Sequence, residues 1–212
     1  MRSRIASARW PLAGIVAAAT VAAAVLVGTA QPAAAPPTAL PAPHFVEEAQ
    51  TAGIDHAYQG EFEFFVGGGV AVFDCDDDGR SELYLAGGSE PAALYHNESQ
   101  LAGALRFTRR ADPETDLDRV VGAYPLDIDS DGQMDLAVLR FGENVLLRGL
   151  GGCRFERANE AWGFDGGERW TTAFSATWEA SAAWPTLAFG NYLDQASTNT
   201  NRLCYDNELF RP

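Results

Sequence analysis

Two nine-residue stretches repeat one acidic pattern: DCDDDGRSE at residues 74–82 and DIDSDGQMD at residues 127–135. In each, carboxylates occupy positions 1, 3, 5 and 9, and glycine occupies position 6. Closely spaced carboxylates converge only where the backbone turns sharply, and glycine takes the positive φ of such a turn without steric cost. The spacing suits a hard cation that takes six to eight oxygen ligands at about 2.3–2.6 Å. We therefore expect each loop to hold Ca²⁺.

The pattern names a ligand set for each loop. In the first loop the expected ligands are Asp74, Asp76, Asp78, Glu82 and the backbone carbonyl of Arg80. In the second loop they are Asp127, Asp129, Asp131, Asp135 and the backbone carbonyl of Gln133. The alternative is an acidic surface turn that binds nothing. Two copies that share every ligand position favour the metal site.

The same spacing begins the calcium loop of an EF-hand, which closes with a glutamate at position 12 and lies between two helices. Here position 12 is Leu85 in the first copy and Val138 in the second. The flanking runs, such as residues 69–73 and 136–139, are short, apolar and rich in β-branched residues, as buried strands are. We therefore predict a strand–loop–strand site that closes at position 9.

Each loop belongs to a longer repeat, because Asp74 and Asp127 are 53 residues apart and later runs also correspond. The triplet Tyr95-His96-Asn97 aligns with Leu147-Arg148-Gly149. A period of about fifty residues with four short strands is typical of β-propeller blades. The predicted fold is therefore all-β, about three blades of an incomplete propeller. The expected units cover about residues 61–115, 116–165 and 166–212.

The third unit retains its strands but has lost its acidic loop. Residues 170–178 and 185–190 are the predicted strands, and the intervening loop carries one acid, Glu179, where four are wanted. We expect no strong metal site there, and we predict a polar, loop-like stretch at residues 191–212. Three blades do not close a propeller, which typically has four to eight. We expect a fragment that lacks the remaining blades, or a partial array whose open edges need a partner.

The first 43 residues have the composition of an export segment. Three arginines precede an apolar run at residues 12–27, and small residues with prolines follow. This order predicts a secretory signal peptide at residues 1–30 and an Ala/Pro-rich linker at residues 31–43, ahead of the propeller at residues 44–212. The alternative is an uncleaved anchor, although these sixteen residues fall short of the roughly 20 that cross a bilayer. The expected location is secreted, periplasmic or at the cell surface.

The charge of the exported part argues against several partners. Beyond residue 43 it holds 29 acids and 12 bases, a formal charge of −17. Nucleic acids and anionic membranes repel such a surface, so we expect an extracellular protein or glycan ligand of open identity. All fifteen bases are arginine, which excludes a Schiff-base lysine and a phosphate-loop lysine.

The three cysteines are Cys75, Cys153 and Cys204. Export permits a disulfide, because the compartments outside the cytoplasm are oxidising. A Cys153–Cys204 bond is a plausible pairing that leaves Cys75 inside the first loop, although spacing leaves the connectivity open. No C-x-x-C spacing occurs, which argues against zinc.

No residue is assigned a catalytic role. The histidines are His44, His56 and His96. His56 lies near Asp55 and upstream of Glu61 and Glu63, but such a histidine more often caps a turn or binds a backbone carbonyl than acts as a general base. Paired carboxylates can hydrolyse glycosides, but the densest acids here are the expected metal ligands. The late aromatic residues either fill space between blades, which we favour, or form a platform for carbohydrate. These residues are Trp162, Phe164, Trp170, Trp178 and Trp184.

The acidic loops resemble the FG-GAP/VCBS repeats of integrin α-subunit propellers and bacterial surface proteins. Three further stretches make the sequence similar to the cartilage acidic protein/UnbV-like family of bacterial exported proteins: AGIDH at residues 52–56, GGGVAVFD at 67–74 and LAFGNY at 187–192. The similarity runs from about His44 and includes DNELFRP at the end. It implies a seven-bladed propeller with calcium in its blade loops, and it assigns ligation to the eight loop acids named above. Glu82 departs from the usual aspartate at position 9.

The resemblance implies an exported calcium-binding protein that acts as a scaffold for adhesion or interaction, with calcium in a structural role. Integrin-like ligand recognition uses a face built from several blades and does not transfer to this chain. The alternative is the amino-terminal part of a secreted propeller enzyme that acts on polysaccharide. Its catalytic residues would lie mostly outside this chain.

Overall fold

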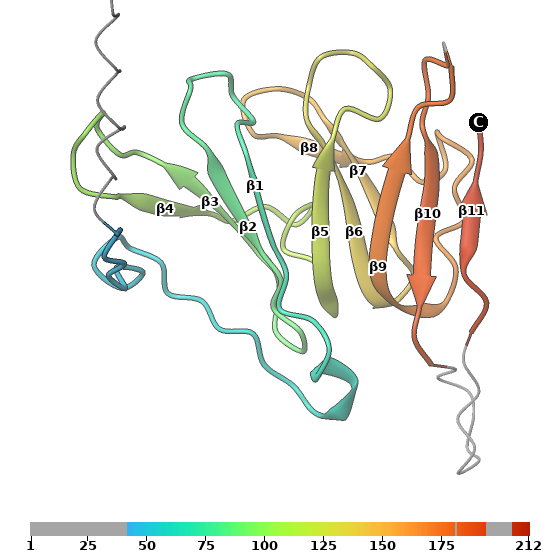
Figure 1. Ribbon diagram of the computed structural model, residues 1–212, viewed down its shortest axis with the longest axis horizontal. Helices are drawn as coiled ribbons and strands as arrows, with labels where there is room; N and C mark the ends of the chain where they lie inside the picture. The colour runs from blue at the N-terminus through green and yellow to red at the C-terminus, as the bar shows by residue number, and fades with distance from the viewer. Residues whose placement is uncertain (1–41, 181, 194–204) are drawn as a thin grey trace, which may run out of the picture. The chain divides into compact units, whose positions relative to one another are not determined.

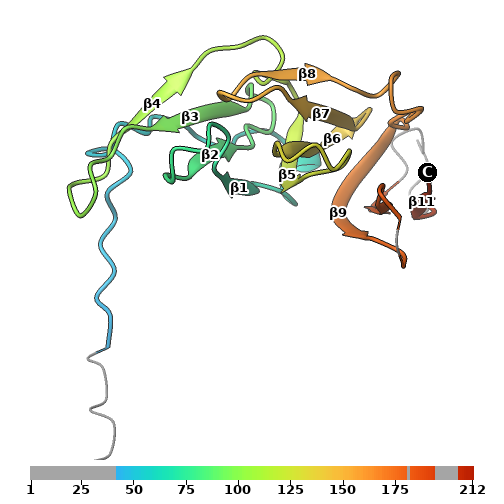
Figure 2. The same cartoon turned by 90° about the horizontal axis from the view of Figure 1, so that it is seen from above.

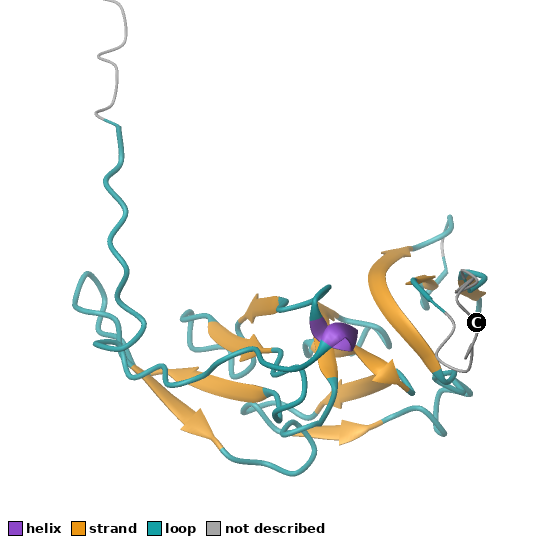
Figure 3. Cartoon of the chain, turned by 90° about the horizontal axis from the view of Figure 1, so that it is seen from below, coloured by secondary structure: helices purple, strands orange, loops and turns teal. Residues whose placement is uncertain are grey.

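The computed structural model describes residues 42–180, 182–193 and 205–212, and those from Phe45 onward form one compact unit. The predicted signal peptide, nearly all of the predicted linker and Cys204 lie outside the described residues. Across the described ranges, no helix is both long enough and apolar enough to pass through a bilayer. Their regular structure is strand, apart from one short 3-10 helix, η1 (Phe62–Phe64) (Figure 3).

The first repeat unit folds as a four-stranded antiparallel sheet in which each strand pairs with the next (Figure 1). Its strands are β1 (Val70–Phe73), β2 (Glu82–Leu85), β3 (Ala93–Asn97) and β4 (Phe107–Arg110). Side chains alternate across a strand, so Ala71 and Phe73 are buried while Val70 and Val72 are exposed. One face of this sheet therefore supplies core residues.

The second unit repeats this order and joins the third unit in one sheet. Its strands are β5 (Val120–Leu126), β6 (Asp135–Gly142), β7 (Val145–Gly149) and β8 (Phe155–Arg157). The third unit contributes β9 (Arg169–Thr177), β10 (Thr186–Asn191) and β11 (Glu208–Phe210). The two units meet where Phe141 and Gly142, at the end of β6, pair with Trp170 and Arg169 of β9.

The predicted all-β class is confirmed, with two antiparallel sheets that close no barrel or ring among the described residues. The prediction of a loop-like stretch at residues 191–212 is wrong at both ends. Asn191 completes β10, and β11 pairs with β10. The reason is Phe210, whose ring lies 4.8 Å from that of Phe164 and 5.7 Å from that of Phe189. That apolar packing holds the strand in place.

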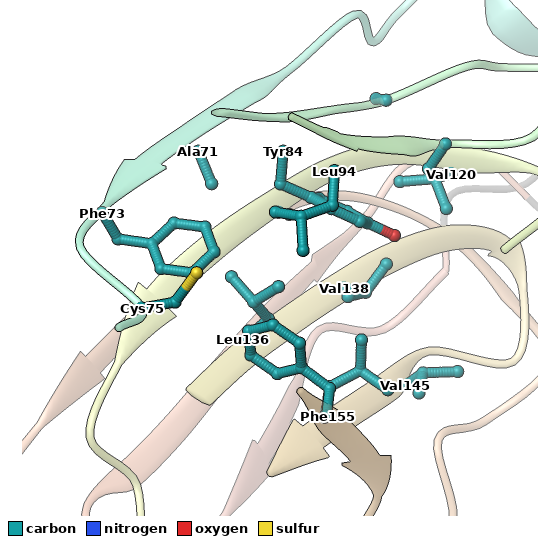
Figure 4. Packing of buried hydrophobic residues seen from close by; sticks show 14 of the residues in the cluster. Ala71, Phe73, Cys75, Tyr84, Leu94, Val120, Leu136, Val138, Val145 and Phe155 are labelled. Atoms are coloured by element: carbon teal, nitrogen blue, oxygen red, sulfur yellow. The ribbon is translucent and has the colours of Figure 1, made fainter. Parts of the chain in front are cut away.

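The main core lies between the first sheet and the β5–β8 part of the second, and Figure 4 shows its side chains meeting from both sides. Phe73 packs edge to face against Phe155, with ring centroids 6.2 Å apart. Tyr84 is fully buried and donates a hydrogen bond to the Thr115 carbonyl at 2.8 Å. Burying a large apolar side chain stabilises a fold by about 1.5–3 kcal/mol. The packing between the two sheets therefore holds in place the strands that the two acidic loops connect.

The first strands of the two units, β1 and β5, run beside each other (Figure 2). Just before β1, the Gly69 N–H donates to the Val121 carbonyl at 3.1 Å. A Cβ on Gly69 would come within 2.8 Å of the Gly122 Cα. The glycine-rich run at residues 67–69 thus serves close backbone packing, which is the usual meaning of glycine where two backbones approach.

The disulfide joins Cys75 to Cys153, with 4.7 Å between their Cα atoms. The predicted Cys153–Cys204 pairing is therefore wrong. The turn between β7 and β8 places Cys153 over the first acidic loop, where its N–H donates to the Cys75 carbonyl at 3.0 Å. Both cysteines are buried in the main core, so the bond connects the two units at the first loop.

The late aromatic residues differ in their burial. Phe164 and Trp170 are buried and fill space around the third unit, as favoured above. Trp178 and Trp184 are 43% and 36% exposed. Trp162 is partly buried and packs edge to face against Trp184, with centroids 5.7 Å apart.

Candidate metal centres

Each acidic loop joins the first strand of its unit to the second, so strands and not helices flank it, as predicted. The two loops follow the same backbone path. Asp77 and Ser130 both have a φ of 60°, and Gly79 and Gly132 have φ values of 81° and 88°. A Cβ on either glycine would meet nothing within 4 Å. Glycine is therefore needed at position 6 for its backbone conformation and not for space.

In the second loop, two carboxylates at the ends of the loop hold the backbone in place. Asp127 at position 1 accepts the N–H groups of Asp131 and Gly132, each at 3.0 Å. Asp135 at position 9 accepts the N–H of Ile128 at 2.6 Å and that of Gly149, on β7, at 2.8 Å. The carboxylates at positions 1 and 9 are therefore fixed before any ligand binds.

The first loop repeats this network. Asp74 accepts the N–H groups of Asp78 at 3.3 Å and Gly79 at 2.8 Å. Glu82 accepts the N–H of Cys75 at 3.0 Å and that of Asn97, on β3, at 3.3 Å. The longer side chain of Glu82 thus occupies the same structural position as Asp135, despite the departure from aspartate.

Three of the four predicted carboxylates come together in each loop. Ligand atoms of Asp74, Asp76 and Glu82 lie within 4.8 Å of one another. The same is true of Asp127, Asp129 and Asp135. We call these two groups the carboxylate trios. Each trio contains positions 1, 3 and 9 of its loop, which are spaced apart in sequence but adjacent in space.

The position-5 carboxylates face arginines. Asp78 forms an ion pair with Arg80 of its own loop, while Asp131 accepts a hydrogen bond from Arg148 at 2.9 Å. The backbone N–H groups of Arg80 and Gln133, at position 7, donate to the carboxylates at position 5. Ligation by the position-7 carbonyls and by the position-5 carboxylates stays a prediction.

The second trio is electrostatically suited to a cation. Asp135 is fully buried, and burial raises its pKa to about 6, against the opposing effect of the two N–H donors. The nearby charges of Asp129 and Asp131 contribute to this rise. A carboxylate that is buried among like charges is stabilised in its charged form by a nearby cation. The residues present therefore fit a divalent oxygen-seeking ion.

The first trio has the same character. Glu82 is fully buried, and burial raises its pKa above the usual range. The Oδ1 atom of Asp76 is buried and has no hydrogen-bond partner among the described residues. An unpartnered buried carboxylate oxygen is costly, and a bound cation would supply the missing partner.

The acid of the third loop serves a different purpose. Glu179 accepts a hydrogen bond from the Thr186 hydroxyl at 2.8 Å and forms an ion pair with Arg211. Its side chain thus joins β10 to the residue that follows β11. The expectation that this loop holds no strong metal site stays a prediction.

Two side chains near the trios were not assigned a role from the sequence. His96 on β3 lies with its Nε2 atom 2.9 Å from Asp76 Oδ2, and Arg148 on β7 lies 2.8 Å from Asp129 Oδ2. The repeat alignment places these two residues at equivalent positions, and this equivalence is the sequence signal that could have identified them. His56, by contrast, lies 2.9 Å from the Ala86 carbonyl, a structural contact of the expected kind.

Comparison with known families supports the repeat assignment. Residues 74–138 match a family model described as FG-GAP-like repeat. The match begins at the first residue of the first loop and ends within β6, so it includes both loops. The match supports the interpretation of this chain as an FG-GAP repeat protein. A search of curated proteins found no match to this chain.

Proposed function

We propose that this protein is an exported calcium-binding repeat protein that acts as a scaffold for adhesion or interaction, with Ca²⁺ holding its loops together. The observation that carries the proposal is the identical arrangement of the two carboxylate trios on the same network of backbone hydrogen bonds. The FG-GAP-like match across both loops supports it. Export rests on the predicted signal peptide.

We further propose that the three units are blades of a β-propeller of the cartilage acidic protein/UnbV-like type. The first two units support this with four strands each, in matching order around matching loops. The role of calcium would be structural. The ion would offset repulsion within each trio and stabilise the folded chain, because only the folded state presents the site. The acidic surface favours an extracellular protein or glycan as partner over nucleic acid or anionic membrane.

Removing calcium should lower the melting temperature, and excess calcium should restore it. Calcium at about a hundred times its Kd stabilises the folded state by about 2.7 kcal/mol per site. Each kcal/mol shifts the melting temperature of a domain of this size by about 2–4 °C. Filling both loops should therefore raise the melting temperature by about 10–20 °C over the value in EDTA. A thermal melt followed by circular dichroism makes this measurement, and equal melting temperatures in EDTA and calcium would rule out structural metal.

Replacing Asp127 with alanine should weaken calcium binding by about tenfold or more at the second loop, because it removes a trio member and the acceptor of two backbone N–H groups. The matched control is Glu179→Ala, which removes an acid from the third loop. That variant should leave calcium affinity unchanged. Calorimetric titration of both variants gives the comparison. Equal losses of affinity would contradict the assignment of the second and third loops.

A further inference from the structure

Arg148 places its guanidinium against two predicted ligands of the second loop. Its Nη2 atom donates to Asp131 Oδ2 at 2.9 Å. Its Nε atom lies 2.8 Å from Asp129 Oδ2 in an ion pair whose N–H is not aligned as a hydrogen bond. The Asp129 side chain is only 9% exposed. The positive charge therefore sits at positions 3 and 5 of the loop, partly shielded from water.

A guanidinium is a permanent cation with five N–H donors and no acceptor, so it competes with a metal and never ligates one. Calcium binding through Asp129 and Asp131 would compete with the guanidinium for these two carboxylates. A second partner for the arginine is already near, because Arg148 Nη1 lies 4.0 Å from Glu156 Oε1. Glu156 is the residue paired with Arg148 across β7 and β8. The guanidinium can therefore turn to Glu156 without crossing the sheet.

The first loop lacks this arrangement. His96 takes the equivalent place on β3 and contacts Asp76 at position 3. Its imidazole is a potential metal ligand, which a guanidinium is not. The arginine of this loop, Arg80, is 44% exposed and forms an ion pair with Asp78, its one such partner among the described residues, while its Nε atom donates to the Asn97 carbonyl. A guanidinium thus holds the position-3 carboxylate in the second loop only.

We propose that Arg148 is a tethered cation that occupies the second loop in the absence of calcium and moves to Glu156 when calcium binds. The first loop should then fill at lower calcium concentration than the second. This inference rests on the proposed function, because it assumes that both loops bind calcium. Arg148, on β7, would thus decide the order in which the two loops bind calcium.

The test is a calorimetric titration of the full chain with calcium alone. The natural chain should bind in two steps, and Asp127→Ala should weaken the weaker step by about tenfold or more while leaving the tighter step in place. Arg148→Gln should strengthen the weaker step by about tenfold, the effect of removing two partly exposed ion pairs of roughly 0.7 kcal/mol each. The same variant should melt about 3–6 °C lower in EDTA, because its carboxylates lose their cation. If the role of Arg148 were purely structural, the variant would lower both the calcium affinity of the weaker step and the melting temperature in EDTA.

Arg157→Gln is the matched control, because it removes the same charge from a neighbouring strand. Arg157 pairs with Glu143 and is 42% exposed, close to the 38% of Arg148. Its variant should leave both calcium steps within about twofold, as expected for an exposed pair away from the site. Glu156→Gln offers a second test. It should weaken the second step by about threefold, because it removes the alternative partner.

The outcomes separate this inference from the proposed function. Two-step binding with an unchanged or weaker second step in Arg148→Gln would overturn the tethered cation and leave calcium binding in place. Loss of the tighter step in Asp127→Ala would overturn the order of filling. Absence of calcium binding in the natural chain and in Arg148→Gln would overturn the proposed function, and this inference with it.

Discussion

Replacing Phe189 with alanine should lower the free energy of unfolding by about 3–5 kcal/mol. Phe189 on β10 is only 1% exposed. Its ring centroid lies 5.2 Å from that of Phe164, 5.1 Å from that of Phe174 and 5.7 Å from that of Phe210. These three rings come from the second unit, β9 and β11. Phe174 and Phe210 lie on strands that are fixed by backbone pairing, so their rings cannot close over the cavity, and the third unit should loosen from the second.

Urea denaturation followed by tryptophan fluorescence measures this loss. The control is Leu209→Ala, one residue from Phe210 on β11, because Leu209 is 66% exposed. An exposed apolar residue contributes little, so the control should change the free energy of unfolding by at most about 0.5 kcal/mol. Similar losses in both variants would show that Phe189 is not the centre of this aromatic cluster.

Replacing both Cys75 and Cys153 with serine should cost about 2–5 kcal/mol of stability. The disulfide closes a loop across a sequence separation of 78 residues, and a long closed loop restricts the unfolded chain strongly. The variant also places two hydroxyl groups in the buried core. The disulfide holds residue 75, whose backbone N–H donates to Glu82, so its loss should in addition weaken calcium binding at the first loop more than at the second.

The double variant and the natural chain are compared by urea denaturation without reductant, and the natural chain is also measured with reductant. Reduced natural chain and double variant should agree within about 1 kcal/mol, as two forms that lack the same bond. Peptide mapping provides the direct check on connectivity. Trypsin should release Cys153 on residues 149–154 and Cys204 on residues 203–212. Recovery of those two peptides joined to each other would contradict the observed pairing.

The acidic loops could be predicted because their structure is local. Asp127 accepts N–H bonds from residues four and five positions later, and the glycine at position 6 supplies the required turn. Side chains that bond to nearby backbone groups define such turns within a few residues. The strands were predictable for a similar reason. The run of residues 120–126 that leads into the second loop coincides with β5.

The surroundings of the carboxylates could not be predicted from the loops. The position-5 aspartate of the second loop faces Arg148, which lies 17 residues later and reaches it only because β6 and β7 pair. His96 approaches Asp76 through the same pairing in the first unit. The repeat alignment places these residues at equivalent positions, but it does not predict which carboxylates their side chains contact. That depends on strand register and on the twist of each sheet.

By itself, the sequence determined the all-β class and the two carboxylate loops, because each depends on residues within about ten positions of one another. It also determined the repeated unit, because one local pattern recurs 53 residues later. The tertiary structure alone decided which cysteines pair, how β11 joins its sheet and which cations face the loops. Those features depend on the turn that packs over each loop and on apolar contacts between distant segments. No local pattern encodes such contacts, since they form only when the two sheets bury their facing side chains.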